Sequence, residues 1–454
     1  MSSLRATELV DGKGPFVAGT FFDLAAVGYE QAEYAVRGTV RAFGRSADGS
    51  VTVVEEAPVT SRMVVYRPSD AMAFDGTVVV EWLNVSGGLD AAPLWTFTHR
   101  ELLRSGSAWV GVSAQRVGIH GGTSALGVVQ GMALQDIDAE RYGPLDHPGD
   151  RFSYDLFTEV GRLVRTGEGT ILAGLPVERV LGVGESQSAF RLTTYVNELD
   201  HEAAAFDGFL VHARGGTAAP LDDAGDPTQL LSGDAALFRD DLRAPVLCVE
   251  AETDLITLGY RAARQPDGDR LVVWEIAGTS HADVYTFVVG FGDDGRQPIE
   301  DLAARWRPSR ELFGSTLEHP VNAGPQHWVL HAAVRALVAW VRDGTRPPAG
   351  ERLELDGLGF ATDACGNALG GIRTPHVDVP TAMLSGLGNG GSPMAFLAGR
   401  TIPFDRERLV ALYGTRSAFV ERFRAAAEAA VAAGFFVAED LDEIVGIAAA
   451  NVDL

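Results

Sequence analysis

A stretch in the middle of the chain, residues 180–190, places the tightest constraint on the fold. It reads Val-Leu-Gly-Val-Gly-Glu-Ser-Gln-Ser-Ala-Phe. An apolar run typical of a β-strand ends at Gly184, Ser186 follows at once, and a helical pattern begins at Ser188. A serine on such a tight turn needs small neighbours, and its hydroxyl then stands above the edge of the sheet. The stretch therefore predicts a nucleophile elbow with the pattern Gly-x-Ser-x-small.

A second interpretation of the same stretch is a dinucleotide-binding loop, because Gly182 and Gly184 form Gly-x-Gly. That fingerprint needs a third Gly or Ala three residues later, where the helix packs closely on the strand. Gln187 stands at that position, which argues against a dinucleotide site.

Apolar runs on both sides of the elbow alternate with helical patterns. Buried strands are expected at 76–82, 108–113, 179–183, 206–211, 245–250 and 270–276. Strands separated by helices at this spacing imply right-handed βαβ crossovers and a mostly parallel sheet. Earlier, β-branched and polar residues alternate at 33–43 and 51–66, which predicts an antiparallel edge. The sequence therefore predicts an α/β fold.

The chain is longer than a single hydrophobic core usually holds, at 454 residues. We divide it into a β-rich sheet edge (1–70), an α/β core (71–285), a lid-like insertion (286–325), a final core helix (326–345) and a C-terminal, partly helical extension packing on the core (346–454). The insertion and the tail near 366–400 are expected to cover the pocket, because additions to such sheets follow the carboxyl ends of strands.

Charge and composition exclude several kinds of site. The net charge of −24 argues against nucleic acid or a membrane surface as a partner. Lys13 is the only lysine, so a Schiff-base lysine is excluded beyond the N-terminal region. Cys248 and Cys365 are too few for a disulfide framework or a thiolate zinc site, and the histidines lack metal-ligand spacing.

The N-terminal residues lack the apolar region of a signal peptide, and no apolar run reaches the length needed to span a membrane. These observations predict a soluble, cytoplasmic protein. The sequence makes no prediction of oligomeric state.

Serine chemistry needs an acid and a histidine later in the chain, in that order. The acid is expected just past the second strand after the elbow, where Asp254 stands four residues beyond the strand. Glu252 is the alternative acid. His281 follows the next strand in a Gly-Thr-Ser loop, which suits a base that shuttles protons. His327, at the start of a helix over 327–341, is expected to line the substrate pocket.

An oxyanion hole needs two N–H donors aimed at the developing negative charge. The residue after the nucleophile, Gln187, is expected to supply one donor. The second is expected from the loop after the early buried strand, from Val85 or otherwise Asn84. Gly87 and Gly88 follow in the same loop and lack side chains, so the loop backbone can approach the substrate closely, and we place both residues in the substrate pocket.

With serine, acid and histidine in this order, the chain resembles the α/β-hydrolase-fold serine hydrolases, and more narrowly the long bacterial α/β-hydrolase-domain proteins that are esterase-like. The matching stretches are 79–88, 109–116, 184–188, 252–255, 277–283, 324–327 and 370–375. The resemblance implies the α/β-hydrolase fold, ester hydrolysis by a serine triad and no cofactor. Two departures from the superfamily pattern are Ser188, where Gly is commonest, and the 84–87 loop, which replaces the His-Gly run of many lipases.

The function predicted on these grounds is hydrolysis of a small carboxylic ester. Ser186 attacks the carbonyl, His281 takes the proton and Asp254 orients the imidazole. Two alternatives stay open: an acyltransferase that uses the same triad with an acceptor other than water, and a hydrolase-fold protein that binds a ligand without turning it over.

Overall fold

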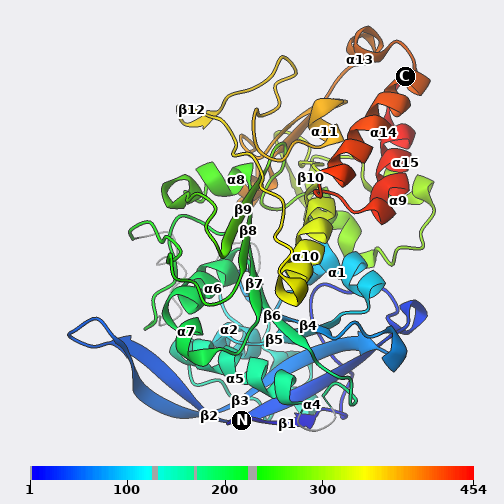
Figure 1. Ribbon diagram of the computed structural model, residues 1–454. Coiled ribbons are helices and arrows are strands. Elements are labelled where there is room, and N and C mark those ends of the chain that lie inside the picture. The colour runs from blue at the N-terminus through cyan, green and yellow to red at the C-terminus, as the bar shows by residue number, and fades with distance from the viewer. Residues whose placement is uncertain (1–2, 125–130, 168–170, 223–232) are drawn as a thin grey trace.

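A nine-stranded β-sheet runs through the protein, with the strand order β1-β2-β3-β5-β4-β6-β7-β8-β9. The structure is a computed structural model that describes residues 3–124, 131–167, 171–222 and 233–454 (Figure 1). The strands are β1 (Arg5–Glu8), β2 (Tyr29–Arg45), β3 (Val51–Pro68), β4 (Thr77–Trp82), β5 (Ala108–Val112), β6 (Arg179–Glu185), β7 (Gly208–His212), β8 (Val246–Ala251) and β9 (Leu271–Ile276). Strands β1, β2 and β3 are antiparallel to their neighbours, and strands β4 to β9 run parallel to one another. The predicted parallel sheet with an antiparallel N-terminal edge is confirmed.

The parallel strands are apolar on both faces because both faces are covered. Successive residues alternate between two cores: Val79 and Leu181 pack into one, and Val78 and Val80 into the other. Helices α1 (Pro93–Ser105) and α10 (Gln326–Asp343) cover the first face, while α5 (Ser153–Thr166) and α6 (Gln187–Glu198) cover the second (Figure 1). Parallel sheets need this double cover, which explains the continuous apolar runs in the sequence.

Several short elements lie in stretches that sequence patterns left as loops. The remaining helices are α2 (Arg116–His120), α3 (Leu134–Ile137), α4 (Ala139–Tyr142), α7 (Asp200–Ala203), α8 (Glu252–Ile256), α9 (Ile299–Arg305), α11 (Pro375–Asp378), α12 (Ala395–Ala398), α13 (Arg406–Tyr413), α14 (Arg416–Ala432) and α15 (Leu441–Asn451). Three small strand pairs are β10 (Glu311–Leu312) with β11 (Ser315–Thr316), β12 (Leu355–Asp356) with β13 (Gly359–Phe360), and β14 (Ala382–Ser385) with β15 (Arg400–Pro403). Elements of two to five residues show less than two turns of periodicity, so the sequence gives little signal for them.

The C-terminal helices share a core with one face of the sheet. Phe419 and Phe423 on α14 and Ile444 on α15 belong to the same apolar cluster as Trp328 on α10. Figure 1 shows α14 and α15 beside α9, on the side of the sheet that carries α10. No helix within the described ranges is long and apolar enough to cross a lipid bilayer.

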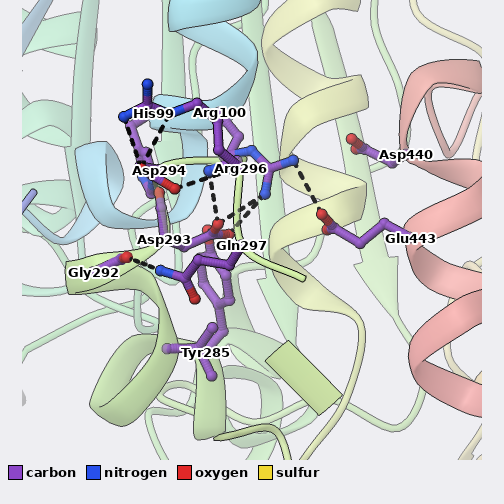
Figure 2. A network of polar contacts seen from close by, with 12 residues as sticks. His99, Arg100, Tyr285, Gly292, Asp293, Asp294, Arg296, Gln297, Asp440 and Glu443 are labelled. Carbon is purple, nitrogen blue, oxygen red and sulfur yellow. Dashed lines mark hydrogen bonds and ion pairs between the residues drawn. The ribbon is translucent and has the colours of Figure 1, made fainter. Parts of the chain in front are cut away.

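A buried polar network joins the segment after β9 to α1 and α15 (Figure 2). Arg100 on α1 donates to both carboxylate oxygens of Asp293 at 2.9 Å, and to Glu443 on α15 at 3.0 Å. Tyr285 Oη donates to the same Asp293 carboxylate at 3.1 Å. Burial alone would raise the pKa of Asp293, but the charges of Arg100 and His99 outweigh it and lower that pKa. Asp293 therefore remains ionised while almost fully buried.

Replacement of Arg100 by methionine tests the energetic weight of this network. Arg100→Met leaves the Asp293 carboxylate buried without its guanidinium, so the free energy of unfolding is expected to fall by about 3–5 kcal/mol. Urea unfolding followed by circular dichroism measures it. The matched control is Arg296→Met, because Arg296 is 55% exposed and pairs with Asp294 at 3.0 Å. The control is expected to cost less than about 1 kcal/mol, and an equal loss in both variants would contradict the assigned role of Arg100.

Candidate functional site

Three side chains from distant parts of the sequence meet at the carboxyl edge of the parallel strands. Ser186 follows β6, Asp254 lies in α8 directly after β8, and His281 lies in the loop after β9. His281 Nε2 is 2.8 Å from Ser186 Oγ, and His281 Nδ1 is 2.6 Å from Asp254 Oδ1. The structure thus joins the predicted serine, acid and base in one continuous chain of hydrogen bonds.

The turn at Ser186 has a backbone conformation that few residues adopt. Its φ is 56° and its ψ is −122°, and its N–H donates to the His212 carbonyl on β7 at 3.0 Å. A Cβ on Gly184 would lie 3.1 Å from the Ser188 carbonyl oxygen and 3.3 Å from the Ser188 Cβ. The strand and the helix therefore approach each other so closely that both flanking positions need small residues, as an elbow requires.

Of the two candidate acids, Asp254 is the one in contact with the imidazole. Its second oxygen, Oδ2, accepts the Ala251 N–H at 2.6 Å, which fixes the carboxylate against the end of β8. Glu252 instead accepts the N–H groups of Gly278 at 2.6 Å and Gly386 at 2.8 Å. Burial raises the pKa of Glu252 to about 7, against the opposing effect of those two hydrogen bonds. Glu252 therefore holds loops together, one of which carries His281.

The electrostatics around His281 favour its protonated form. Burial alone would lower the pKa of His281, but the carboxylate of Asp254 outweighs it, with Glu185 adding to the effect, so that the pKa is raised. With Nδ1 donating to Asp254, the neutral imidazole presents a lone pair on Nε2 to the Ser186 hydroxyl. The arrangement can accept a proton from Ser186 and stabilise the resulting imidazolium.

Two backbone amides are candidates for donation to a bound substrate: that of Gln187, the residue after Ser186, and that of Val85 in the loop after β4. Within the described ranges, neither the Gln187 N–H nor the Val85 N–H has a hydrogen-bond acceptor. The Asn84 N–H, by contrast, donates to the Ala91 carbonyl at 2.9 Å, so it is not available as the alternative donor. The Asn84 side chain accepts the Ser86 N–H at 2.8 Å through Oδ1, which shapes the turn that carries Val85.

A cavity of about 230 Å³ opens beside the serine and histidine. Its walls are largely apolar and come from the loop after β4, the start of α1, the segment after β9 and the C-terminal extension. The lining residues are Ala18, Asn84, Ser86, Gly87, Ala91, Ala92, Pro93, Thr96, Glu185, Ser186, His281, Ala282, Thr286, Phe287, Phe291, Phe313, Met394 and Leu397. Residues of both 286–325 and 366–400 thus contribute to its walls.

Two predicted pocket residues lie elsewhere. Gly88 has a φ of +82°, and a Cβ there would be 2.6 Å from the Gly122 carbonyl oxygen, so it serves loop packing and does not line the cavity. His327 stacks on Tyr285, with ring centroids 3.8 Å apart, and is buried beside Trp306. It lies in the first turn of α10, where its ring is buried among aromatic side chains and is not part of the cavity lining, which explains the difference from the prediction.

Sequence reasoning missed three residues that position the histidine loop. Thr253 Oγ1 accepts the His281 N–H at 3.1 Å and donates to the Gly386 carbonyl at 2.6 Å. Asn322 donates through Nδ2 to the Gly278 and Ser385 carbonyls, both at 3.1 Å. Gly386 belongs to a glycine-rich stretch whose only sequence signal is the glycines themselves. These contacts join residues that are 28 to 133 positions apart in the sequence, and no local pattern reveals them.

Comparison with known proteins places these observations in a family. The family model described as the alpha/beta hydrolase domain matches residues 5–446. A search of curated proteins found no match. Among solved structures, esterase Est22 is 13% identical, with 61% of this chain and 79% of that chain covered and a TM-score of 0.33. An esterase from Pyrobaculum calidifontis is 15% identical (60% and 85% covered, TM-score 0.30), and a thermostable esterase from Pseudomonas putida is 11% identical (56% and 75% covered, TM-score 0.30).

Replacement of Gly386 tests how tightly the C-terminal extension packs on the loops of the site. A Cβ at this residue would lie 2.4 Å from the Thr279 carbonyl oxygen and 2.7 Å from the Thr253 nitrogen. Gly386→Ala must therefore displace backbone, and the free energy of unfolding is expected to fall by about 1–3 kcal/mol. Denaturant unfolding measures the loss. Gly268→Ala is the control, because a Cβ there meets nothing closer than the Leu271 Cβ at 4.0 Å. Equal stability of the two variants would contradict the tight packing around Gly386.

Proposed function

We propose that this chain, which belongs to the α/β-hydrolase-domain family, hydrolyses a carboxylic ester through an acyl-enzyme formed on Ser186. One observation carries the proposal: a continuous hydrogen-bonded chain runs from Asp254 through His281 to Ser186 Oγ at the wall of a cavity. A carboxylate, an imidazole and a hydroxyl in this order are the parts that nucleophilic acyl transfer needs.

Acylation begins when Ser186 Oγ attacks the ester carbonyl carbon and its proton passes to His281 Nε2. The carbonyl oxygen takes up the negative charge, and the unoccupied N–H groups of Gln187 and Val85 are suited to stabilise it. Asp254 stabilises the imidazolium through Nδ1 without taking its proton. The imidazolium then protonates the leaving alcohol, and the acyl group remains on Ser186.

Deacylation repeats these steps with water as the nucleophile. His281 removes a proton from the water, the new tetrahedral intermediate collapses, and Ser186 leaves with the proton from Nε2. The apolar walls of the cavity, which include Phe287, Phe291 and Leu397, suit a small ester with apolar substituents. We therefore assign the protein as a serine esterase that acts on small molecules.

Replacement of the nucleophile is the direct test. Ser186→Ala is expected to lower kcat for p-nitrophenyl butyrate by at least about 10⁴-fold and to abolish labelling by a fluorophosphonate probe. Mass spectrometry of the wild-type protein should find the label on Ser186. The control is Ser188→Ala, two residues along, which keeps its Cβ and is expected to retain labelling and most of the activity. Wild-type turnover in Ser186→Ala would reject the mechanism.

A pair of substitutions tests which acid orients the histidine. Asp254→Asn is expected to lower kcat by about 10⁴-fold, because an amide stabilises the wrong tautomer of His281 and carries no charge. Glu252→Gln keeps the size of a residue that accepts hydrogen bonds from the Gly278 and Gly386 amides and bonds the Ser385 side chain. It loosens the histidine loop without changing the tautomer of His281, so it is expected to lower kcat by less than about 100-fold. Circular dichroism checks that both variants fold. A larger loss in Glu252→Gln than in Asp254→Asn would reverse the assignment.

A further inference from the structure

A second carboxylate faces His281 from the side of the nucleophile. Glu185, the residue before Ser186, has its Oε1 at 3.5 Å from His281 Nε2, and its side chain is 7% exposed. Asn84 donates through Nδ2 to the Glu185 carbonyl at 3.1 Å and to its Oε2 at 3.3 Å. Glu185 also lines the cavity. The Glu185 side chain is thus held in place by Asn84, lies next to His281 and forms part of the cavity wall.

The charges around Glu185 come from several elements. His281 and Asp254 lie after β9 and β8, Glu81 is on β4, and His212 on β7 is its neighbour in the sheet register. Burial raises the pKa of Glu81 to about 8 and lowers that of His212 to about 4, so both are uncharged near neutral pH. His281 and Asp254 are therefore the charges that matter. Among the described residues, no Arg or Lys pairs with Glu185 or lines the cavity.

We propose that Glu185 is a positioning and specificity-determining residue for the ester hydrolysis proposed above. Its carboxylate stabilises the imidazolium of His281 from the Nε2 side, and it excludes esters that carry a negative charge next to the scissile bond. The substrate class of the enzyme is then an ester whose acyl group is uncharged. This inference rests on the proposed function, because it assigns a role within that reaction.

The reaction balances without any proton transfer to Glu185. The proton of Ser186 Oγ moves to His281 Nε2 as the bond from oxygen to the carbonyl carbon forms, and it later moves to the leaving alcohol. Glu185 acts only by its charge, opposite Asp254, so that a carboxylate faces each ring nitrogen of the transient imidazolium. Water then releases the acyl group as a carboxylic acid, which ionises. The same carboxylate repels this anion and favours its release.

The charge of Glu185 also sets the pH range in which His281 acts as a base. An anion beside Nε2 favours the protonated imidazole, so the pKa of His281 is higher with Glu185 than without it. Burial in turn raises the pKa of Glu185 to about 7, with the nearby positive charge of His281 acting in the opposite direction. Removal of the Glu185 charge must therefore move the acid limb of activity to lower pH.

Glu185→Gln tests the inference, because it removes the charge and keeps both the size and an oxygen acceptor for Asn84. The first measurement is the rate at which an uncharged fluorophosphonate labels Ser186 from about pH 5 to 9. The midpoint of the acid limb is expected to fall by roughly 1 pH unit. The second is the ratio of kcat/KM for p-nitrophenyl butyrate to that for the anionic mono-p-nitrophenyl succinate, measured at about pH 8, where a carboxyl group with a pKa of about 7 is mostly ionised. The ratio is expected to fall about tenfold in the variant.

The control Glu202→Gln removes an exposed carboxylate on α7 and is expected to leave both measurements unchanged. Glu185→Asp, which keeps the charge, is expected to keep the preference for the uncharged ester.

If Glu185→Gln does not fold, the wild-type protein still decides: it must prefer the uncharged ester by about tenfold or more, and equal kcat/KM values overturn the inference. If Glu185→Gln is labelled with the same acid-limb midpoint as the wild-type protein and has the same ratio of kcat/KM values, the role of Glu185 is overturned and the proposed function stands. Absence of any Ser186 labelling in the wild-type protein overturns the proposed function and this inference together.

Discussion

Two backbone amides, those of Gly278 and Gly386, donate to the buried carboxylate of Glu252. This contact joins the end of β8, the loop after β9 and the C-terminal extension, and Thr253 repeats the connection through its hydroxyl. Because His281 reaches Ser186 only if its loop is held in one place, the separation of 2.8 Å between the two side chains depends on these contacts. The C-terminal extension is therefore part of the structure that positions His281, although it supplies none of the three hydrogen-bonded side chains Ser186, Asp254 and His281.

Buried carboxylates gather around a single imidazole in this site. Asp254 and Glu185 face the two ring nitrogens of His281, and Glu81 on β4 interacts electrostatically with Glu185. Burial raises the pKa of the two glutamates, to about 7 for Glu185 and to about 8 for Glu81. Desolvation thus keeps Glu81 neutral and leaves Glu185 close to its titration point. The electrostatic field at Ser186 comes mainly from the carboxylates next to His281, and the large negative charge of the whole chain contributes less across the intervening distance.

The parts of the fold and site that could be predicted are those with a local pattern or a fixed order along the chain. Continuous apolar runs located the parallel strands, and the small residues around Ser186 located the turn, because sterics there allow few alternatives. Chain order then placed Asp254 and His281 after their strands. The contacts of Gly386 with Glu252 and Thr253 and the buried position of His327 could not be predicted, because they depend on contacts between segments distant in the sequence. The closeness of Glu185 to His281 Nε2 likewise depends on a contact between distant segments, because β7 and β8 lie between β6 and β9 in the sheet.

The segment after β9 forms part of the cavity wall and is also anchored on both sides. Phe287 and Phe291 line the cavity, while Tyr285 and Asp293, next to them, belong to the buried network with Arg100. Movement of this segment as a rigid flap would separate a buried ion pair, at a cost of about 3–5 kcal/mol. Phe313 is 61% exposed, and its ring packs edge-on against Phe287 with the centroids 5.6 Å apart, so its side chain can rotate at far lower cost than the separation of an ion pair. We therefore expect substrate access to depend on side chains at the cavity mouth, with the aromatic wall behind them fixed in place.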